Sequence, residues 1–173
     1  MRFFLFLSSI LAIFFFTSLQ IPAFTKDIPQ DFSASLKEEM EYSKAISVLL
    51  ENDISGADSQ TQQFLGRLYY LNGESKKALE TFTKIKEKSW IDYVYLGLIY
   101  EDLSDSGLAI KNYLASLKLK INSIALYRLG KIFYHNKRYR KAAQFFQDTL
   151  NCDSSIRLAN YYLGECFIKM GNY

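Results

Sequence analysis

The sequence predicts an all-α protein built as an array of antiparallel helix-turn-helix repeats. The stretches FLGRLYY, YLGLIYE, RLGKIFY and YLGECFI recur at intervals of 31, 33 and 34 residues. An alanine follows each of the first three central glycines by twelve residues, and an aromatic residue follows each alanine by four. The only two prolines, which would interrupt helices, lie before residue 30. Internal repeats of this period indicate stacked helical units, because one unit cannot bury its apolar face alone.

The first 25 residues have the pattern of an export signal. Arg2 is followed by an almost unbroken apolar run to Phe16, and a small-x-small pattern ends at Thr25. If the segment is not cleaved, it is about long enough to anchor the chain in a bilayer, for which roughly 20 apolar residues suffice. We therefore expect a signal peptide at 1–25, with an uncleaved N-terminal anchor as the alternative.

Residues 26–58 are expected to hold a loop followed by one helix. Pro29 and scattered Ser and Asp residues favour a loop that gives way to a helix from about Ser35. The stretch EYSKAISVLLE looks like the second helix of an earlier, degenerate repeat, with Ala45 at the alanine position. The apolar face of this helix is predicted to consist of Leu36, Met40, Ala45, Ile46, Leu49 and Leu50.

Residues 59–173 are expected to form three complete units and one incomplete unit, at 59–89, 90–122, 123–156 and 157–173. Close packing of two antiparallel helices explains the pattern. A glycine at the crossing lets the backbones approach, the small alanine of the second helix faces the first, and the aromatic residue fills the groove between neighbouring units. The four glycines of this pattern are Gly66, Gly97, Gly130 and Gly164.

The turns between paired helices carry their own signals. Asn72-Gly73 and Gly171-Asn172 are residue pairs that readily take a positive φ, and Ser75 is expected to cap the helix that follows it.

Leu-Gly-x-x-aromatic followed by Ala-x-x-x-aromatic resembles the tetratricopeptide repeat. The resemblance covers about residues 40–173 and implies a right-handed superhelix whose first helices line a concave, partner-binding groove. The alanines and aromatic residues that carry it are Ala78 and Phe82, Ala109 and Tyr113, and Ala142 and Phe146. The sequence departs from the family at the closing proline, which is missing, and at the tryptophan position, which is filled by Gln62, Tyr93, Leu126 and Asn160.

The last unit lacks its second helix. Extending the register from Gly164 by twelve residues passes beyond Tyr173. We therefore expect the sequence to be a fragment of a longer protein, or another chain to cover the exposed face of the last helix. That face is predicted to include Tyr161, Leu163, Phe167 and Ile168.

The sequence offers no grouping of catalytic or metal-binding residues. His135 is the only histidine, and it stands beside a basic run without a Ser/His/Asp or Cys/His pattern. Cys152, Cys166 and His135 lack the spacing of metal ligands. We expect the cysteines to be free, because about ten residues of helix would hold them too far apart for a disulfide; a bond to a missing segment is the alternative. These observations predict a non-enzymatic protein with no cofactor, metal or disulfide.

Charge divides the chain into two regions. Residues 26–105 carry nine basic and fifteen acidic residues, whereas 106–147 carry nine basic residues and no acidic one. The sharpest cluster of positive charge is a predicted basic patch of Lys137, Arg138, Arg140 and Lys141. This region is either a solvated face or a site for an anionic partner such as an acidic peptide, a phospholipid head group or a cell-wall polymer. No nucleic-acid-binding motif accompanies it.

The resemblance also implies which residues line the concave groove. The set is rich in tyrosine, a rigid residue that offers contact area and a hydroxyl at low entropic cost. We expect several of these aromatic residues to pack between units instead. Transferred position by position, the groove consists of Phe64, Arg67, Tyr70, Tyr95, Glu101, Tyr127, Arg128, Lys131, Tyr134, Tyr161 and Tyr162.

From these features we expect an exported scaffold or adaptor of a bacterial cell envelope, in the periplasm or outer envelope, that binds a protein or peptide in the groove. Contact with a membrane is expected only through the N-terminal segment, if it is retained. The first alternative is a structural component that binds an anionic envelope polymer through residues 106–147. The second is the non-catalytic part of a larger enzyme.

Overall fold

The computed structural model describes residues 32–51 and 59–171, and side chains from residue 41 onward within these ranges except Glu51. Within them the chain is helical and contains no strand, which confirms the predicted all-α fold. The helices are α2 (Phe32–Glu51), α3 (Ser59–Leu71), α4 (Ser75–Lys84), α5 (Trp90–Asp102), α6 (Ser106–Leu119), α7 (Ser123–His135), α8 (Tyr139–Cys152) and α9 (Arg157–Met170). The predicted export signal at 1–25 lies outside the described residues.

The chain divides into two compact units, Met1–Lys37 and Glu38–Tyr173, and only the second is described over most of its length. None of the helices in the described ranges is both long and apolar enough to cross a membrane. In α2, Ile46 is buried as predicted and Tyr42 is buried as well, whereas Leu50 is exposed. The prediction of Leu50 on the apolar face was therefore wrong, because the buried side of α2 follows the four-residue spacing from Tyr42 to Ile46.

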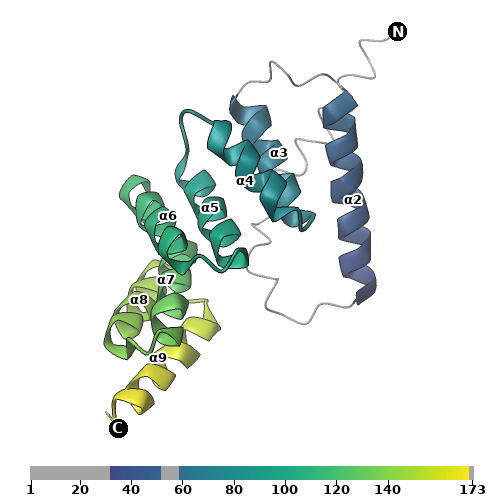
Figure 1. Cartoon of the computed structure of the whole chain (residues 1–173). Helices are drawn as coiled ribbons and strands as arrows, with labels where there is room; N and C mark the ends of the chain where they lie inside the picture. The colour runs from purple at the N-terminus through teal and green to yellow at the C-terminus, as the bar shows by residue number, and fades with distance from the viewer. Residues whose placement is uncertain (1–31, 52–58, 172–173) are drawn as a thin grey trace. The chain divides into compact units, whose positions relative to one another are not determined.

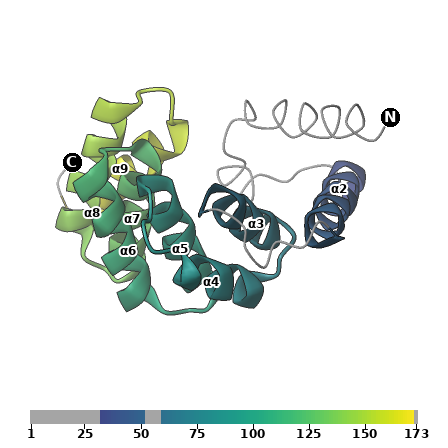
Figure 2. The ribbon, with the colours of Figure 1, turned by 90° about the horizontal axis from the view of Figure 1, so that it is seen from above.

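Helices α3 to α9 pack in sequence order. Figures 1 and 2 show α5 beside α6, then α7 beside α8, then α9 beside α8, and the contacts between these helices agree. Helix α3 likewise packs on α4, and α4 and α6 each contact the first helix of the next pair. The described part of the second unit is therefore a helical-repeat array, as predicted.

The glycine of each complete pair lies under the aromatic residue sixteen positions later. A methyl group at Gly66 would lie 3.0 Å from the Phe82 ring, and one at Gly130 would lie 2.7 Å from a carbon of the Phe146 side chain. A methyl group at Gly97 would overlap the Tyr113 ring. The three aromatic residues and the alanines four positions before them have no exposed surface. Glycine is therefore required so that the ring of the second helix can rest on the backbone of the first.

The three turns inside the helix pairs share one geometry. Gly73, Ser104 and Lys137 stand seven residues after the pattern glycine and have φ values of 79°, 62° and 58°. In each turn the next residue donates its backbone N–H to the carbonyl five residues before it, as Arg138 does to Phe133 at 2.9 Å. This is the usual closure of an α-helix by one left-handed residue. The predicted positive φ at Gly73 is confirmed, and so is that at Gly171, with φ 73°.

Helix N-termini are capped in several ways. Ser89 and Asp92 form a capping box at α5, and the Asp105 and Asn122 side chains accept backbone hydrogen bonds at α6 and α7. The prediction that Ser75 caps α4 was wrong: Glu74 holds the capping position, and the Ser75 hydroxyl donates to Asp102 Oδ2 at 3.0 Å. The reason is the left-handed turn residue Gly73, after which Glu74 takes the N-cap and Ser75 is already the first residue of the helix.

Candidate protein-binding surface

The predicted groove residues come from the first helices α3, α5, α7 and α9, and the structure separates them by burial. Tyr70, Tyr95 and Tyr127 are only 5%, 3% and 2% exposed. Burial raises the pKa of Tyr95 to about 12, and the neighbouring Arg67 acts in the opposite direction. These three tyrosines pack between units and cannot offer contact area to a partner, which corrects their place in the predicted groove.

Four accessible tyrosines lie where α7, α8 and α9 meet. The Tyr134 ring makes edge contacts with Tyr139 and Tyr162, at centroid distances of 5.6 and 5.3 Å. Tyr161, which is 61% exposed, makes an edge contact with Tyr162 at 5.4 Å. These four residues, here called the tyrosine surface, combine packed rings with one ring that faces solvent. Contacts between neighbouring rings favour a pre-organised surface.

Two charged residues border the tyrosine surface. The Tyr134 hydroxyl donates to Glu165 Oε2 at 3.2 Å, and Lys131 Nζ lies 5.9 Å from the centroid of the Tyr127 ring. Burial, together with the Glu165 carboxylate, raises the pKa of Tyr134, so its hydroxyl is a donor at neutral pH. Glu165 and Tyr139 were not predicted. Glu165 stands one residue after its pattern glycine, as Arg67 and Lys131 do, whereas Tyr139 lies on a second helix, outside the positions that the resemblance supplies.

The middle of the predicted groove is polar and mostly enclosed. Tyr113 donates its hydroxyl to Glu101 Oε1, and Arg128 Nη1 lies 3.7 Å from Glu101 Oε2. Burial raises the pKa of Glu101, while Arg128 and the Tyr113 hydroxyl oppose the shift. Of Arg128 only 9% is exposed. Glu101 and Arg128, both expected to line the groove, do lie close together. They form an ion pair with each other between units.

The N-terminal end of the predicted groove is occupied by internal contacts as well. Arg67 Nη2 donates to Asp92 Oδ1 at 3.3 Å, and Asp92 is fully buried at the start of α5. Phe64 is half-buried. The ion pair links α3 to α5, so Arg67 has a structural role here beside any contact with a partner.

The predicted basic patch forms the turn between α7 and α8. Lys137 is the left-handed residue of this turn, Arg138 precedes α8, and Arg140 and Lys141 lie in its first turn. All four are exposed, and none forms an ion pair with another described residue. Lys141 Nζ lies 5.4 Å from the centroid of the Phe133 ring. The patch is a compact region of uncompensated positive charge.

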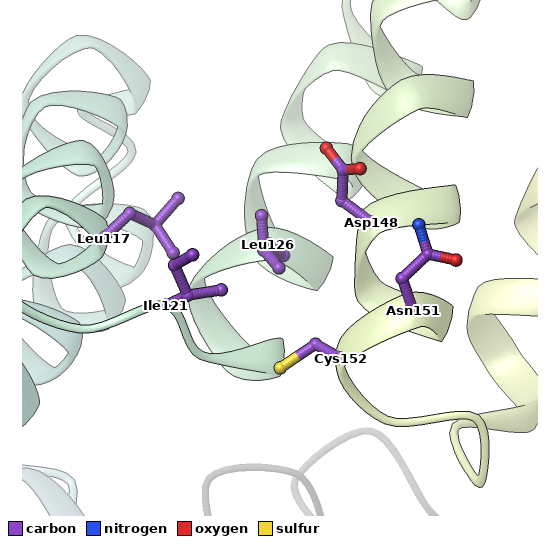
Figure 3. Close-up of a pocket in the computed structure, with 6 residues that line it drawn as sticks. All are labelled: Leu117, Ile121, Leu126, Asp148, Asn151 and Cys152. Atoms are coloured by element: carbon purple, nitrogen blue, oxygen red, sulfur yellow. The ribbon is translucent and has the colours of Figure 1, made fainter.

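A surface pocket of about 450 Å³ opens between α6, α7 and α8. Figure 3 shows Leu117 on one side, Asp148 and Asn151 on the other, and Leu126 between them, with Ile121 and Cys152 at the lower edge. Leu126 occupies the position at which the resembling family has tryptophan, and its smaller side chain fills less of this space. The pocket holds no grouping of an acid, a base and a nucleophile, so we assign no chemistry to it.

The remaining candidates for chemistry lie apart. His135 is exposed at the end of α7, with its ring centroid 5.7 Å from that of Tyr134. Both cysteines are free; Cys152 is exposed and Cys166 is buried, and burial raises the pKa of the Cys166 thiol. In the ranges that the structure describes, no three His, Cys, Asp or Glu residues come close enough to hold a metal ion.

Comparisons with known proteins show what one helix pair and the fold are similar to. Residues 124–151 match the family model "Tetratricopeptide repeat". A structure described as "Crystal structure of MamA" has a TM-score of 0.70 at 19% identity and covers 84% of this chain and 88% of its own. A second, "Crystal structure of MamA protein", has a TM-score of 0.69 at 18% identity and covers 81% of this chain and 82% of its own. A third, "MamA AMB-1 P212121", has a TM-score of 0.66 at 19% identity, over 81% of this chain and 80% of its own.

No protein of curated function matches the sequence. At these identities the solved structures show a shared fold, and the family model covers the third helix pair, in which the glycine, alanine and aromatic residue stand at the repeat positions. The described helices from Ser59 to Met170 repeat that arrangement. The third helix pair therefore matches the tetratricopeptide repeat, and the chain shares its fold with the solved structures described as MamA.

Proposed function

We propose that the chain is a non-enzymatic scaffold that binds an extended segment of a partner protein on the tyrosine surface. The observation that carries this proposal is the contrast among groove tyrosines. Those of α3 and α5 are buried between units, whereas Tyr161 is 61% exposed beside rings that pack on one another. An exposed ring held on a rigid support is a favourable contact site, because little side-chain entropy is lost on binding.

Polar groups beside the tyrosine surface could form hydrogen bonds with a bound segment. Tyr134 and Glu165 share a hydrogen bond across α7 and α9, and Lys131 stands on the same face of α7. A peptide backbone laid over the rings would find both hydrogen-bond donors and an acceptor within this small area.

The proposal is tested with Tyr161→Ser, which removes the exposed ring and leaves the buried rings in place. We expect partner protein recovered with the tagged full chain from an extract of its source cells to fall about tenfold, since an exposed aromatic anchor contributes about 1.5 kcal/mol or more. Thr81→Ala, a surface change on α4, serves as the matched control. Equal recovery with Tyr161→Ser and wild type would remove the tyrosine surface from the function.

We further propose that the chain is exported to a bacterial cell envelope and works there. The supporting feature is the basic start, apolar run and small-x-small pattern of residues 1–25. In a bacterial host, a C-terminally tagged full chain is expected in the periplasmic or membrane fraction, with N-terminal sequencing to locate any cleavage near Thr25. Recovery in the cytosol with Met1 intact would contradict export.

A further inference from the structure

The basic patch reverses the charge that the other two turns place before a second helix. Glu74, Asp105 and Arg138 stand eight residues after their pattern glycines, directly before α4, α6 and α8. A helix N-terminus favours an acidic residue, because its backbone N–H groups carry partial positive charge. Asp105 follows this rule and accepts a hydrogen bond from the Leu108 N–H at 2.9 Å. Arg138 breaks it and makes no side-chain cap.

The residue before Arg138 breaks a second local rule. Lys137 has φ 58°, at the position where Gly73 and Gly171 have φ 79° and 73°. Left-handed backbone favours glycine, so a lysine there is held against its conformational preference. Lys137 and Arg138 are thus two successive cations at positions that favour other residues. Such departures concentrate at functional sites, so we infer that these two residues serve a function rather than the stability of the turn.

The first turn of α8 adds charge without neutralising it. Lys77 and Lys141 stand at equivalent positions, and each lies over an aromatic ring, at 5.5 Å from Tyr69 and 5.4 Å from Phe133. Lys77 also pairs with Glu74. Lys141 has Arg138 in the place of that glutamate, so the same architecture becomes a cluster of positive charge.

The basic patch is continuous with the tyrosine surface. Tyr139 lies between Arg138 and Arg140 in the sequence, and its ring contacts Tyr134 at 5.6 Å. We propose that the partner segment is acidic, with its carboxylates on the basic patch and its neighbouring residues over the tyrosine surface. This inference rests on the proposed function and names the chemistry of the partner. An acidic peptide fits better than a polyanionic polymer or a lipid surface, because charge alone would not require the adjoining rings.

The experiment measures fluorescence anisotropy of a labelled peptide in which Asp and Glu alternate with Leu and Pro, titrated with the full chain. A second peptide carries Asn and Gln in place of the acids. We expect the acidic peptide to bind at least about tenfold more tightly, and its affinity to fall as salt rises. Arg138→Glu with Arg140→Glu is expected to weaken binding about tenfold or more, as charge reversal at a contact does.

The matched control is Lys111→Glu with Lys118→Glu, which makes the same change of charge at exposed residues of α6. It is expected to change the affinity less than about threefold, the residual effect of screened charges at a distance. Arg138→Asp supplies a second readout. It places an aspartate before α8, at the position that Asp105 holds before α6. The melting temperature should therefore rise while affinity for the acidic peptide falls.

Three results would overturn the inference. Equal loss of binding in both double variants would show an effect of net charge rather than a site on the basic patch. Tighter binding of polyphosphate or of vesicles with anionic lipid than of the peptide would assign the patch to another partner. Equal affinity for both peptides, or no binding of either peptide, would reject the proposal that the partner segment is acidic. If binding of the neutral peptide still depends on Tyr161, the proposed function stands without this inference.

Discussion

The contact between the second and third helix pairs differs from its two neighbours at the same three positions. Between the first and second pairs, Tyr95 stacks on Phe82 at 6.0 Å and meets the edge of Tyr70 at 5.5 Å. Between α7–α8 and α9, Tyr162, Phe146 and Tyr134 repeat this arrangement, with both distances at 5.3 Å. The middle contact has Arg128, Tyr113 and Glu101 at the equivalent positions, joined by a hydrogen bond and an ion pair.

The difference shows that one repeat pattern supports two kinds of contact between units. Aromatic trios are held by burial and ring geometry, and no charged residue belongs to either trio. The polar trio satisfies the Tyr113 hydroxyl and holds a carboxylate in a largely buried place, which costs desolvation and is offset by its partners. The middle contact should therefore tolerate structural change less well and respond to pH, while the outer contacts should not.

The largest effect is expected from adding a methyl group beneath the polar trio. Gly97→Ala would push a Cβ into the Tyr113 ring, which cannot move away without breaking its hydrogen bond to Glu101. We expect a loss of about 3 kcal/mol in the free energy of unfolding, measured by urea titration, at the upper end of the usual cost of overpacking. Gly130→Ala, under Phe146, should lower the free energy of unfolding by about 2 kcal/mol, since a phenylalanine ring has no hydroxyl to hold it in place by a hydrogen bond.

Gly164→Ala is the matched control, because no atom lies within 4 Å of a Cβ built there. This variant should be neutral or more stable by up to about 1 kcal/mol, the difference in helix propensity between glycine and alanine. A larger loss at Gly130 than at Gly97 would show that the hydrogen bond does not restrain Tyr113, and the contrast between the two contacts would weaken.

The sequence was sufficient for the repeat register because the register depends on local spacing. In every complete pair the aromatic residue sixteen positions after the glycine lies over it, and the alanine twelve positions after it is fully buried. Burial of the groove tyrosines could not be predicted in the same way. Tyr70 and Tyr134 share a register position, yet the first is buried and the second half-exposed, because burial depends on the side chains of the next unit.

Two other features were beyond the reach of a pattern. Ser104 and Lys137 adopt the left-handed conformation although neither is glycine, so their residue types do not predict the turn. The polar trio joins residues from three helices, and its members look like ordinary groove or packing positions until the helices are placed. Prediction succeeded where a fixed spacing within one unit determines the contact. It failed where residues other than glycine take the left-handed conformation and where two units share the contact.

A smaller effect is expected from titration of the polar trio. Glu101 has a pKa raised by burial, so the folded state holds its proton more tightly than the unfolded state does. Relative to Glu101→Gln, the wild type should therefore lose stability as pH rises from the ordinary carboxyl value, about 4.3, through the raised value. Below that window the difference between the two proteins should be constant. Urea titrations at a series of pH values measure this difference directly.

Glu80→Gln gives a control of opposite sign. Glu80 is exposed, and its hydrogen bond to Lys84 lowers its pKa, so this pair stabilises the fold only once the carboxyl is ionised and its contribution grows as pH rises. The change should be small, because a surface ion pair is screened by solvent. If the stability of Glu101→Gln follows that of the wild type at every pH, Glu101 ionises as easily in the folded chain as in water. The middle contact would then be open to solvent and would differ from the aromatic contacts in composition but not in the way it is held together.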